Sequence, residues 1–295
     1  MKRISLYIVT ILAAAGIARA ADGDLFPYPQ APADMQRLDE RCDYIISRFW
    51  RQCDFKSAMS RSEKLHSTFG DWIALMPYAH ADTVHAAIER LLASVAKNGS
   101  HTLTLARMAE DFTYCDTAEF RSSEIFLPFA KAAANHKKIS AADREHFASH
   151  IRRIENSETG KHVEHLDFTT TEGIKANLDN YHTQMVVLFF NNRDCIDCSM
   201  ARVRLSADYN INQLIDRKLL TVIFIDTNAA DNYWLQSAAS YPSNWVIGAS
   251  TDAEKWFDLS NPPTILLLDG RHKVLAKNLT ADGLMAMMAK IAGNS

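Results

Sequence analysis

The chain has 295 residues, of which 47% are hydrophobic and 23% are charged, and its formal net charge at pH 7 is -3. This composition is that of an ordinary globular protein with room for two domains. The mildly acidic charge argues against nucleic acid and against anionic membrane surfaces as partners.

The first 20 residues have the layout of a cleavable secretory signal. A basic start, Lys2-Arg3, precedes an apolar stretch that ends in the small-x-small triplet Ala18-Arg19-Ala20. The apolar stretch is shorter than the roughly 20 residues that a membrane-spanning helix needs. An uncleaved membrane anchor is the alternative. We therefore expect export to the periplasm or beyond, cleavage near Ala20, and membrane contact only during export.

Residues 21–157 are predicted to form a lead-in followed by a helical domain. Residues 21–33 hold three prolines and little periodicity, which favours a tether or surface segment. Across residues 34–157, apolar side chains recur at three- and four-residue spacing, as in amphipathic helices. No strong strand pattern interrupts this region.

Residues 158–295 have the pattern of an α/β domain. Short, unbroken apolar runs of this kind are typical of strands covered on both faces. The runs are "MVVLFF" (185–190), "LLTVIFID" (219–226) and "TILLLD" (264–269).

The segments around these runs complete the predicted domain. Residues 195–218 predict one or two helices, and therefore a β-α-β unit. Gly270-Arg271 predicts a hairpin turn, and residues 281–293 predict a last helix. Residues 162–168, "HVEHLDF", alternate as an edge strand does.

The stretch "NNRDCIDCSMAR" (191–202) carries a C-x-x-C pair directly after the first apolar run. At the first turn of a helix, the sulfur of Cys195 meets unsatisfied N–H groups and the positive end of the helix dipole. Both favour the thiolate, which is the nucleophilic form. Cys198 lies three residues on and is placed to resolve a mixed disulfide. We predict that Cys195 attacks and Cys198 resolves.

Three alternatives compete with a redox couple: a structural zinc site, a permanently closed disulfide, and a scaffold that keeps an idle pair. Zinc needs four ligands, and the sequence has no second C-x-x-C. His162 and His165 are merely close together in a strand-like segment. We predict no metal and see no redox-cofactor site. Export favours the redox couple, because dithiols cycle through disulfides outside the cytoplasm.

The order of these features resembles a thioredoxin-fold domain of the TlpA-like extracytoplasmic type, over roughly residues 158–295. The helical half resembles DUF5106, a domain of unknown function that precedes such domains in exported Bacteroidota proteins. The stretches that carry this second resemblance are "DYIISRFWRQCDF" (43–55) and "AEDFTYCDTAEFRSSEIFLPF" (109–129), with "YPSNWVIG" (241–248) similar to the same two-domain family. The resemblance implies an all-α domain followed by a central mixed sheet flanked by helices.

The thioredoxin resemblance gives a role to Pro262-Pro263-Thr264. It implies that Pro263 is a cis-proline facing the dithiol, where it shapes a groove for a substrate backbone. The alternative is a proline that simply starts a strand. Pro262 departs from the usual pattern, because it has no N–H to offer an incoming peptide. We therefore expect narrow recognition of protein substrates.

Charged residues surround the first cysteine. Asp194 and Asp197 bracket Cys195, and nearby carboxylates raise the pKa of a thiol, while Arg193 acts in the opposite direction. A less stabilised thiolate makes a more reducing couple, so we predict a reductase. The alternative is that both aspartates cap the helix and point to solvent. The strand "MVVLFF" contains no acid that would accept a proton from Cys198.

The other three cysteines are predicted to be structural. On an unbroken helix, Cys42 and Cys53 lie about 16 Å apart, beyond the reach of about 7 Å that a disulfide allows. Cys42 lies on an apolar face and is expected to be a buried core thiol. A disulfide from Cys115 to Cys42 or Cys53 is the alternative, and we expect Cys115 to be free.

These features together predict an extracytoplasmic thiol–disulfide oxidoreductase. Its partners would be protein thiols and disulfides and an upstream electron-donor protein, with the helical half selecting or presenting a client. The alternative is a non-enzymatic binding module on a thioredoxin scaffold, in which the dithiol is incidental.

Overall fold

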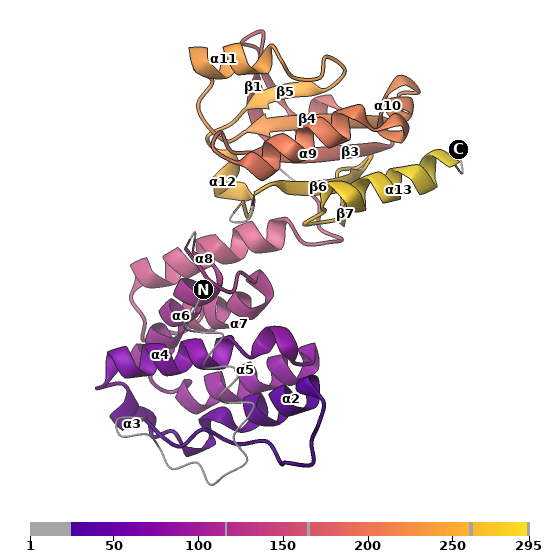
Figure 1. The fold of residues 1–295 in the computed structure, drawn as a ribbon. Helices are drawn as coiled ribbons and strands as arrows, with labels where there is room; N and C mark the ends of the chain where they lie inside the picture. The colour runs from indigo at the N-terminus through magenta and orange to yellow at the C-terminus, as the bar shows by residue number, and fades with distance from the viewer. Residues whose placement is uncertain (1–24, 116, 164–165, 260–261, 294–295) are drawn as a thin grey trace. The chain divides into compact units, whose positions relative to one another are not determined.

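The computed structural model describes the following residues: 25–115, 117–163, 166–259 and 262–293 (Figure 1). The predicted signal at residues 1–20 lies outside them. No helix in the described part of the chain is long and apolar enough to cross a membrane. The chain forms two compact units that divide between Ala148 and Ser149, and each is described separately.

The first unit is built of helices and short 3-10 turns, in agreement with the periodicity of its sequence. In chain order these are α2 (Leu38–Arg48), η1 (Phe49–Gln52), α3 (Phe55–Ala58), α4 (Ser62–Ile73), η2 (Met76–Tyr78), α5 (Ala81–Val95), α6 (Gly99–Thr113), α7 (Ser123–Ala134) and α8 (Ala141–Asn156). Helix α8 continues past the division between the two units.

An aromatic core holds the first unit together. Trp72, Phe69 and Phe129 are fully buried. The ring centroids of Phe69 and Trp72 lie 5.7 Å apart, and so do those of Phe69 and Phe129. Rings at this spacing gain edge-to-face attraction in addition to the burial of their area. Gly70 leaves room for this packing, because a Cβ there would lie 2.6 Å from the ring of Phe112.

The described part of the proline-containing lead-in packs against this core, so of the two expectations, a tether or a surface segment, the tether does not hold for it. Phe26 is buried, and its ring centroid lies 5.8 Å from that of Phe49 and 5.6 Å from that of Trp50. The hydroxyl of Tyr28 donates a hydrogen bond of 2.9 Å to Asp71. The apolar side chains within the segment outweigh the loop signal of its prolines.

The three cysteines outside the C-x-x-C motif are free, as predicted. Cys42 is buried on the inner face of α2, and burial raises the pKa of its thiol to about 11. Burial also raises the pKa of the Cys53 thiol, to about 12. Both thiols therefore stay protonated and unreactive near neutral pH. The helix that carries Cys42 ends at Arg48, so the assumption of one unbroken helix up to Cys53 was wrong.

The second unit is a mixed sheet with helices. In chain order its elements are β1 (Asp167–Thr170), β2 (Lys175–Asn177), η3 (Leu178–Asn180), β3 (Met185–Asn191), α9 (Ile196–Ala207), α10 (Tyr209–Asp216), β4 (Leu220–Asp226), α11 (Asn232–Ala238), β5 (Val246–Ala249), α12 (Ala253–Trp256), β6 (Thr264–Asp269), β7 (Val274–Ala276) and α13 (Ala281–Gly293). The strand order is β2-β1-β5-β4-β3-β6-β7.

Strand β3 lies inside the sheet and is buried on both faces, as its apolar run predicts. It pairs parallel to β4 and antiparallel to β6. Val187 and Phe189 belong to the core beneath α9, α10 and α13. Val186 and Leu188 belong to the core on the opposite face. The predicted β-α-β unit, the hairpin of β6 with β7 and the final helix α13 are all present (Figure 1).

Two features of the sheet differ from the sequence prediction. The expected edge strand at residues 162–168 begins only at Asp167, and it pairs with both β2 and β5, so it is internal. The three-residue strand β2 and strand β5 were not predicted. Strand β5 is four residues long and contains Gly248, which weakens a strand signal. The glycine is needed, because a Cβ there would lie 2.3 Å from the ring of Phe168.

Candidate functional site: a dithiol at a helix start

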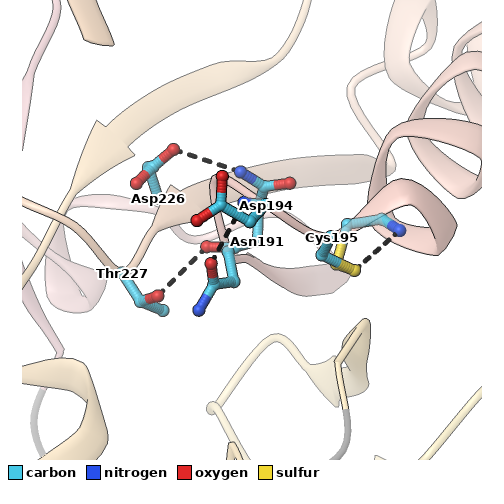
Figure 2. The surroundings of a disulfide bond; sticks show 7 residues. Asn191, Asp194, Cys195, Asp226 and Thr227 are labelled. Atoms are coloured by element: carbon cyan, nitrogen blue, oxygen red, sulfur yellow. Dashed lines mark hydrogen bonds between the residues drawn. A yellow bond between two sulfur atoms is a disulfide. The ribbon is translucent and has the colours of Figure 1, made fainter. Parts of the chain in front are cut away.

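The C-x-x-C pair lies where β3 leads into α9. Cys195 is the N-cap residue of α9, and its sulfur accepts a hydrogen bond of 3.0 Å from the backbone N–H of Cys198 (Figure 2). The two sulfurs form a disulfide, and the two Cα atoms lie 5.2 Å apart. The predicted placement of the pair at the first turn of a helix is therefore confirmed.

The two cysteines differ in exposure. Cys195 is half-buried, whereas Cys198 is fully buried within the core beneath α9. A partner sulfur therefore has access to Cys195, and Cys198 is shielded from it. The N–H bond and the helix dipole both act on the sulfur of Cys195 and favour its negative form. This asymmetry suits an attacking residue and a resolving residue.

The side chain of Arg193 is bound by the loop before α11. Its guanidinium donates to both carboxylate oxygens of Asp231, at 3.0 and 3.2 Å, and stacks 4.9 Å from the ring centroid of Tyr233. Asp231 raises the pKa of Arg193 through these bonds. Asp231 also caps α11 through the N–H of Trp234, which lowers the pKa of Asp231. The charge of Arg193 is thus largely compensated before it acts on Cys195.

Asp194 and Asp197 are both exposed. Within the described ranges, neither has an ion-pair partner. The acceptor that caps α9 is the sulfur of Cys195, so neither aspartate side chain caps the helix. Their effect on the thiol of Cys195 stays a prediction.

The proline loop lies beside the first turns of α9. The peptide bond between Pro262 and Pro263 is cis, as the thioredoxin resemblance implied. Thr264 is buried at the start of β6, opposite Phe190 of β3. Pro262 and Pro263 line a hollow of about 290 Å³ together with Asp197 and residues of the loop before α13.

The structure therefore brings three of the predicted residues, Asp197, Pro262 and Pro263, to one hollow beside α9. Arg193 does not line this hollow and is bound to Asp231 instead. A larger hollow of about 690 Å³ lies among the ends of β4 and β5 and the β1–β2 hairpin. None of the predicted site residues lines it.

A buried polar pair beside the dithiol was missed by the sequence analysis. Asn191 ends β3, and its amide donates a 3.1 Å hydrogen bond to the buried carboxylate of Asp226, which ends β4 (Figure 2). Asp226 also accepts from the backbone and side-chain N–H groups of Asn228, at 2.9 and 3.0 Å. The backbone N–H and hydroxyl of Thr227 donate to the carbonyl of Asn191, at 2.9 and 3.2 Å.

These bonds fix the residue from which the loop to Cys195 departs. A signal for the pair was present in the sequence, because Asn191 and Asp226 each end an apolar run. Parallel neighbours bring their carboxyl ends to the same edge of a sheet, and β3 and β4 pair these two residues directly.

The sheet order, the dithiol at the start of α9 and the cis-proline before β6 define the second unit as a thioredoxin-like domain. A solved structure of a thioredoxin-like protein from Bacteroides caccae ATCC 43185 has this fold. It is 20% identical, covers 91% of this chain and 99% of its own, and has a TM-score of 0.68.

The chain belongs to the family described as domain of unknown function DUF5106, whose model matches residues 9–157. Two further solved structures match the chain in part. The thioredoxin domain of a thiol-disulfide oxidoreductase from Bacteroides vulgatus is 21% identical over 46% of this chain and 98% of its own, with a TM-score of 0.41. A thiol:disulfide interchange protein from Bacteroides sp. is 21% identical over 46% and 91%, with a TM-score of 0.39. A comparison with curated proteins found no match.

Proposed function

We propose that this protein is a thiol–disulfide oxidoreductase that works outside the cytoplasm and reduces disulfides in a small set of client proteins. One observation carries the proposal. The half-buried Cys195 caps α9 and is joined by a disulfide to the buried Cys198 in the first turn of the same helix. The sulfur of Cys195 is accessible to a partner protein, and the buried sulfur of Cys198 is placed to resolve the mixed disulfide.

The reaction begins with the reduced dithiol. The thiolate of Cys195 attacks one sulfur of a client disulfide, the client S–S bond breaks, and the second client sulfur leaves and takes up a proton. The thiolate of Cys198 then attacks the sulfur of Cys195 and releases the first client sulfur as a thiol. The client gains two electrons and two protons, and the protein is left as the disulfide. An upstream electron-donor protein must then reduce it again.

The charges around Cys195 support the reducing direction. Asp194 and Asp197 oppose a thiolate at Cys195, and the opposing charge of Arg193 is compensated by Asp231. We expect a reduction potential closer to the about -270 mV of thioredoxin than to the about -120 mV of a strongly oxidising dithiol. Equilibration with glutathione buffers measures it, and a value near the oxidising end would contradict the reductase proposal.

The basic, apolar and small-x-small pattern of residues 1–20 supports export. Mass spectrometry of the protein purified from its native host should find a chain that begins at Ala21. A full-length chain in the cytoplasmic fraction would contradict this part of the proposal. Pro262 supports a narrow client range, because it removes one backbone donor from the edge of the groove.

Reduction of insulin by the reduced protein tests the activity. The wild-type protein should accelerate the precipitation of the insulin B chain by dithiothreitol, and a Cys195→Ser/Cys198→Ser double variant should not. If the wild-type protein reduces neither insulin nor a simple disulfide, the proposed activity is wrong and the alternative of a binding module gains support.

A further inference from the structure

The outer face of α9 exposes a row of apolar side chains beside the dithiol. Ile196, Met200 and Val203 are spaced four and three residues apart and therefore lie on one side of the helix. Their side chains are 77%, 58% and 58% exposed. The opposite side of the helix is buried and is formed by Cys198, Ala201 and Leu205. Grouped exposed apolar side chains of this kind mark interaction surfaces.

This row continues into the hollow beside the proline loop. Met200 lines the hollow together with Pro262, Pro263 and Leu279. The volume of this hollow, about 290 Å³, is just below the range of roughly 300–1,000 Å³ that is typical of pockets for small molecules. The hollow is therefore better suited to a side chain of a polypeptide that lies along α9 than to a free ligand.

The uncompensated charge at the rim of this surface is negative. Asp194 and Asp197 are exposed and have no ion-pair partner in the part of the chain that the structure describes. The arginines on either side are each bound by a carboxylate, Arg193 by Asp231 and Arg204 by Asp282.

The other arginine of α9, Arg202, contacts a different residue. Arg202 stacks over the ring of Tyr241, 4.5 Å from its centroid, and lies off the exposed row. A basic side chain that approaches Cys195 along the row therefore meets the carboxylates of Asp194 and Asp197, and the described arginines nearby are each bound by another side chain. An acidic side chain meets repulsion at the same place.

We propose that the outer face of α9 and the hollow beside it form a client-binding surface, and that it selects polypeptide segments with apolar and basic side chains next to the reacting cysteine. This inference rests on the proposed function and names the class of client that the dithiol serves. The apolar side chains of the client cover Met200 and Val203, and its basic side chain pairs with Asp194 or Asp197.

Reduction of matched peptides tests the surface. Each short peptide carries one cysteine in a disulfide with a fluorescent reporter thiol, so that reduction releases the reporter. The flanking residues are lysine with leucine, glutamate with leucine, or lysine with serine. We expect kcat/KM for the lysine–leucine peptide to exceed that for the lysine–serine peptide about tenfold. At low salt, kcat/KM for the lysine–leucine peptide should exceed kcat/KM for the glutamate–leucine peptide about fivefold. This lysine-over-glutamate ratio should decrease in high salt, because salt screens the charges.

Variants separate this surface from a general effect on the domain. Met200→Ser/Val203→Ser should lower the leucine-over-serine ratio to near one and keep the lysine-over-glutamate ratio. The matched control is Ile174→Ser in the turn between β1 and β2, where an apolar side chain is 62% exposed away from the dithiol. This control should keep both ratios. Thermal unfolding of each variant verifies that it is folded.

The outcomes distinguish the two proposals. If hydroxyethyl disulfide and all the peptides are reduced, and the peptides are reduced at equal rates, the proposed client-binding surface is wrong. The proposed oxidoreductase function is then still supported. The proposed client-binding surface is also wrong if kcat/KM is higher for the glutamate–leucine peptide than for the lysine–leucine peptide. It is equally wrong if Met200→Ser/Val203→Ser keeps the preference for leucine over serine. If neither hydroxyethyl disulfide nor any peptide is reduced, the proposed function fails, and the client surface fails with it.

Discussion

Cys198→Ser is expected to accumulate a stable mixed disulfide between Cys195 and a client, whereas Cys195→Ser should trap none. The reason is the unequal placement of the two sulfurs. Cys195 is half-buried at the start of α9, and Cys198 is fully buried in the first turn of that helix. Without Cys198, attack by Cys195 still occurs but the mixed disulfide has no internal sulfur to resolve it.

The difference in exposure between Cys195 and Cys198 also determines how strongly Cys195→Ser should lower the rate of disulfide reduction. Removal of the attacking sulfur in Cys195→Ser should lower the rate of disulfide reduction at least about 10³-fold, because no other thiol of the chain is placed to substitute for it. Of the free cysteines, Cys42 and Cys53 have pKa values raised to about 11 and about 12 by burial, and so remain thiols at neutral pH.

Non-reducing gels and mass spectrometry of the captured partners, after expression of each variant in the native host, measure the trapping. Cys115→Ser in the first unit is the matched control, because it removes a free thiol and keeps the dithiol. Equal trapping by Cys195→Ser and Cys198→Ser would contradict the assigned order of attack.

Asp226→Ala is expected to lower the free energy of unfolding by roughly 3 kcal/mol, because it leaves buried donors without an acceptor. The carboxylate of Asp226 accepts from the amide of Asn191 and from two N–H groups of Asn228. Asp226→Asn keeps one acceptor oxygen, so its loss should be smaller. The exposed Asp197→Asn is the stability control and should change the free energy by less than about 0.5 kcal/mol.

The second expected effect of Asp226→Ala is on the dithiol. Asn191 anchors the loop that leads to Cys195, so a loosened anchor should slow the attack by Cys195 even where the protein remains folded. Urea unfolding gives the stability, and the rate of Cys195 alkylation in the reduced protein gives the effect on the site. Unchanged stability together with an unchanged alkylation rate would show that the buried pair does not support the site.

The parts of this molecule that the sequence predicted are those with a local chemical cause. Cys195 and Cys198 follow an apolar run, and a helix start is where such a pair gains its chemistry. The long strands β3, β4 and β6 were recognisable because burial on both faces leaves continuous apolar runs. The burial of Cys42 and the absence of a disulfide between Cys42 and Cys53 were also predicted correctly.

What the sequence did not reveal depends on contacts between distant residues. Strand β5 has only four residues, and Gly248 is explained by the ring of Phe168, about 80 positions earlier in the chain. The pairing of Asn191 with Asp226 requires the strand register. The compensation of Arg193 by Asp231 requires the position of the loop before α11. None of these is a property of one segment.

The hydrogen bond from the N–H of Cys198 to the sulfur of Cys195 has a consequence for the redox cycle. The sulfur is itself the cap of α9 and accepts this bond in the disulfide. A thiolate sulfur is also an acceptor, so the same bond is available in the reduced form. Opening and closing the disulfide therefore leaves the end of the helix capped in either state. The oxidised and reduced proteins would then share one backbone at the start of α9 and differ at the half-buried sulfur of Cys195. A client or an electron donor would distinguish the two forms by the chemical state of that sulfur.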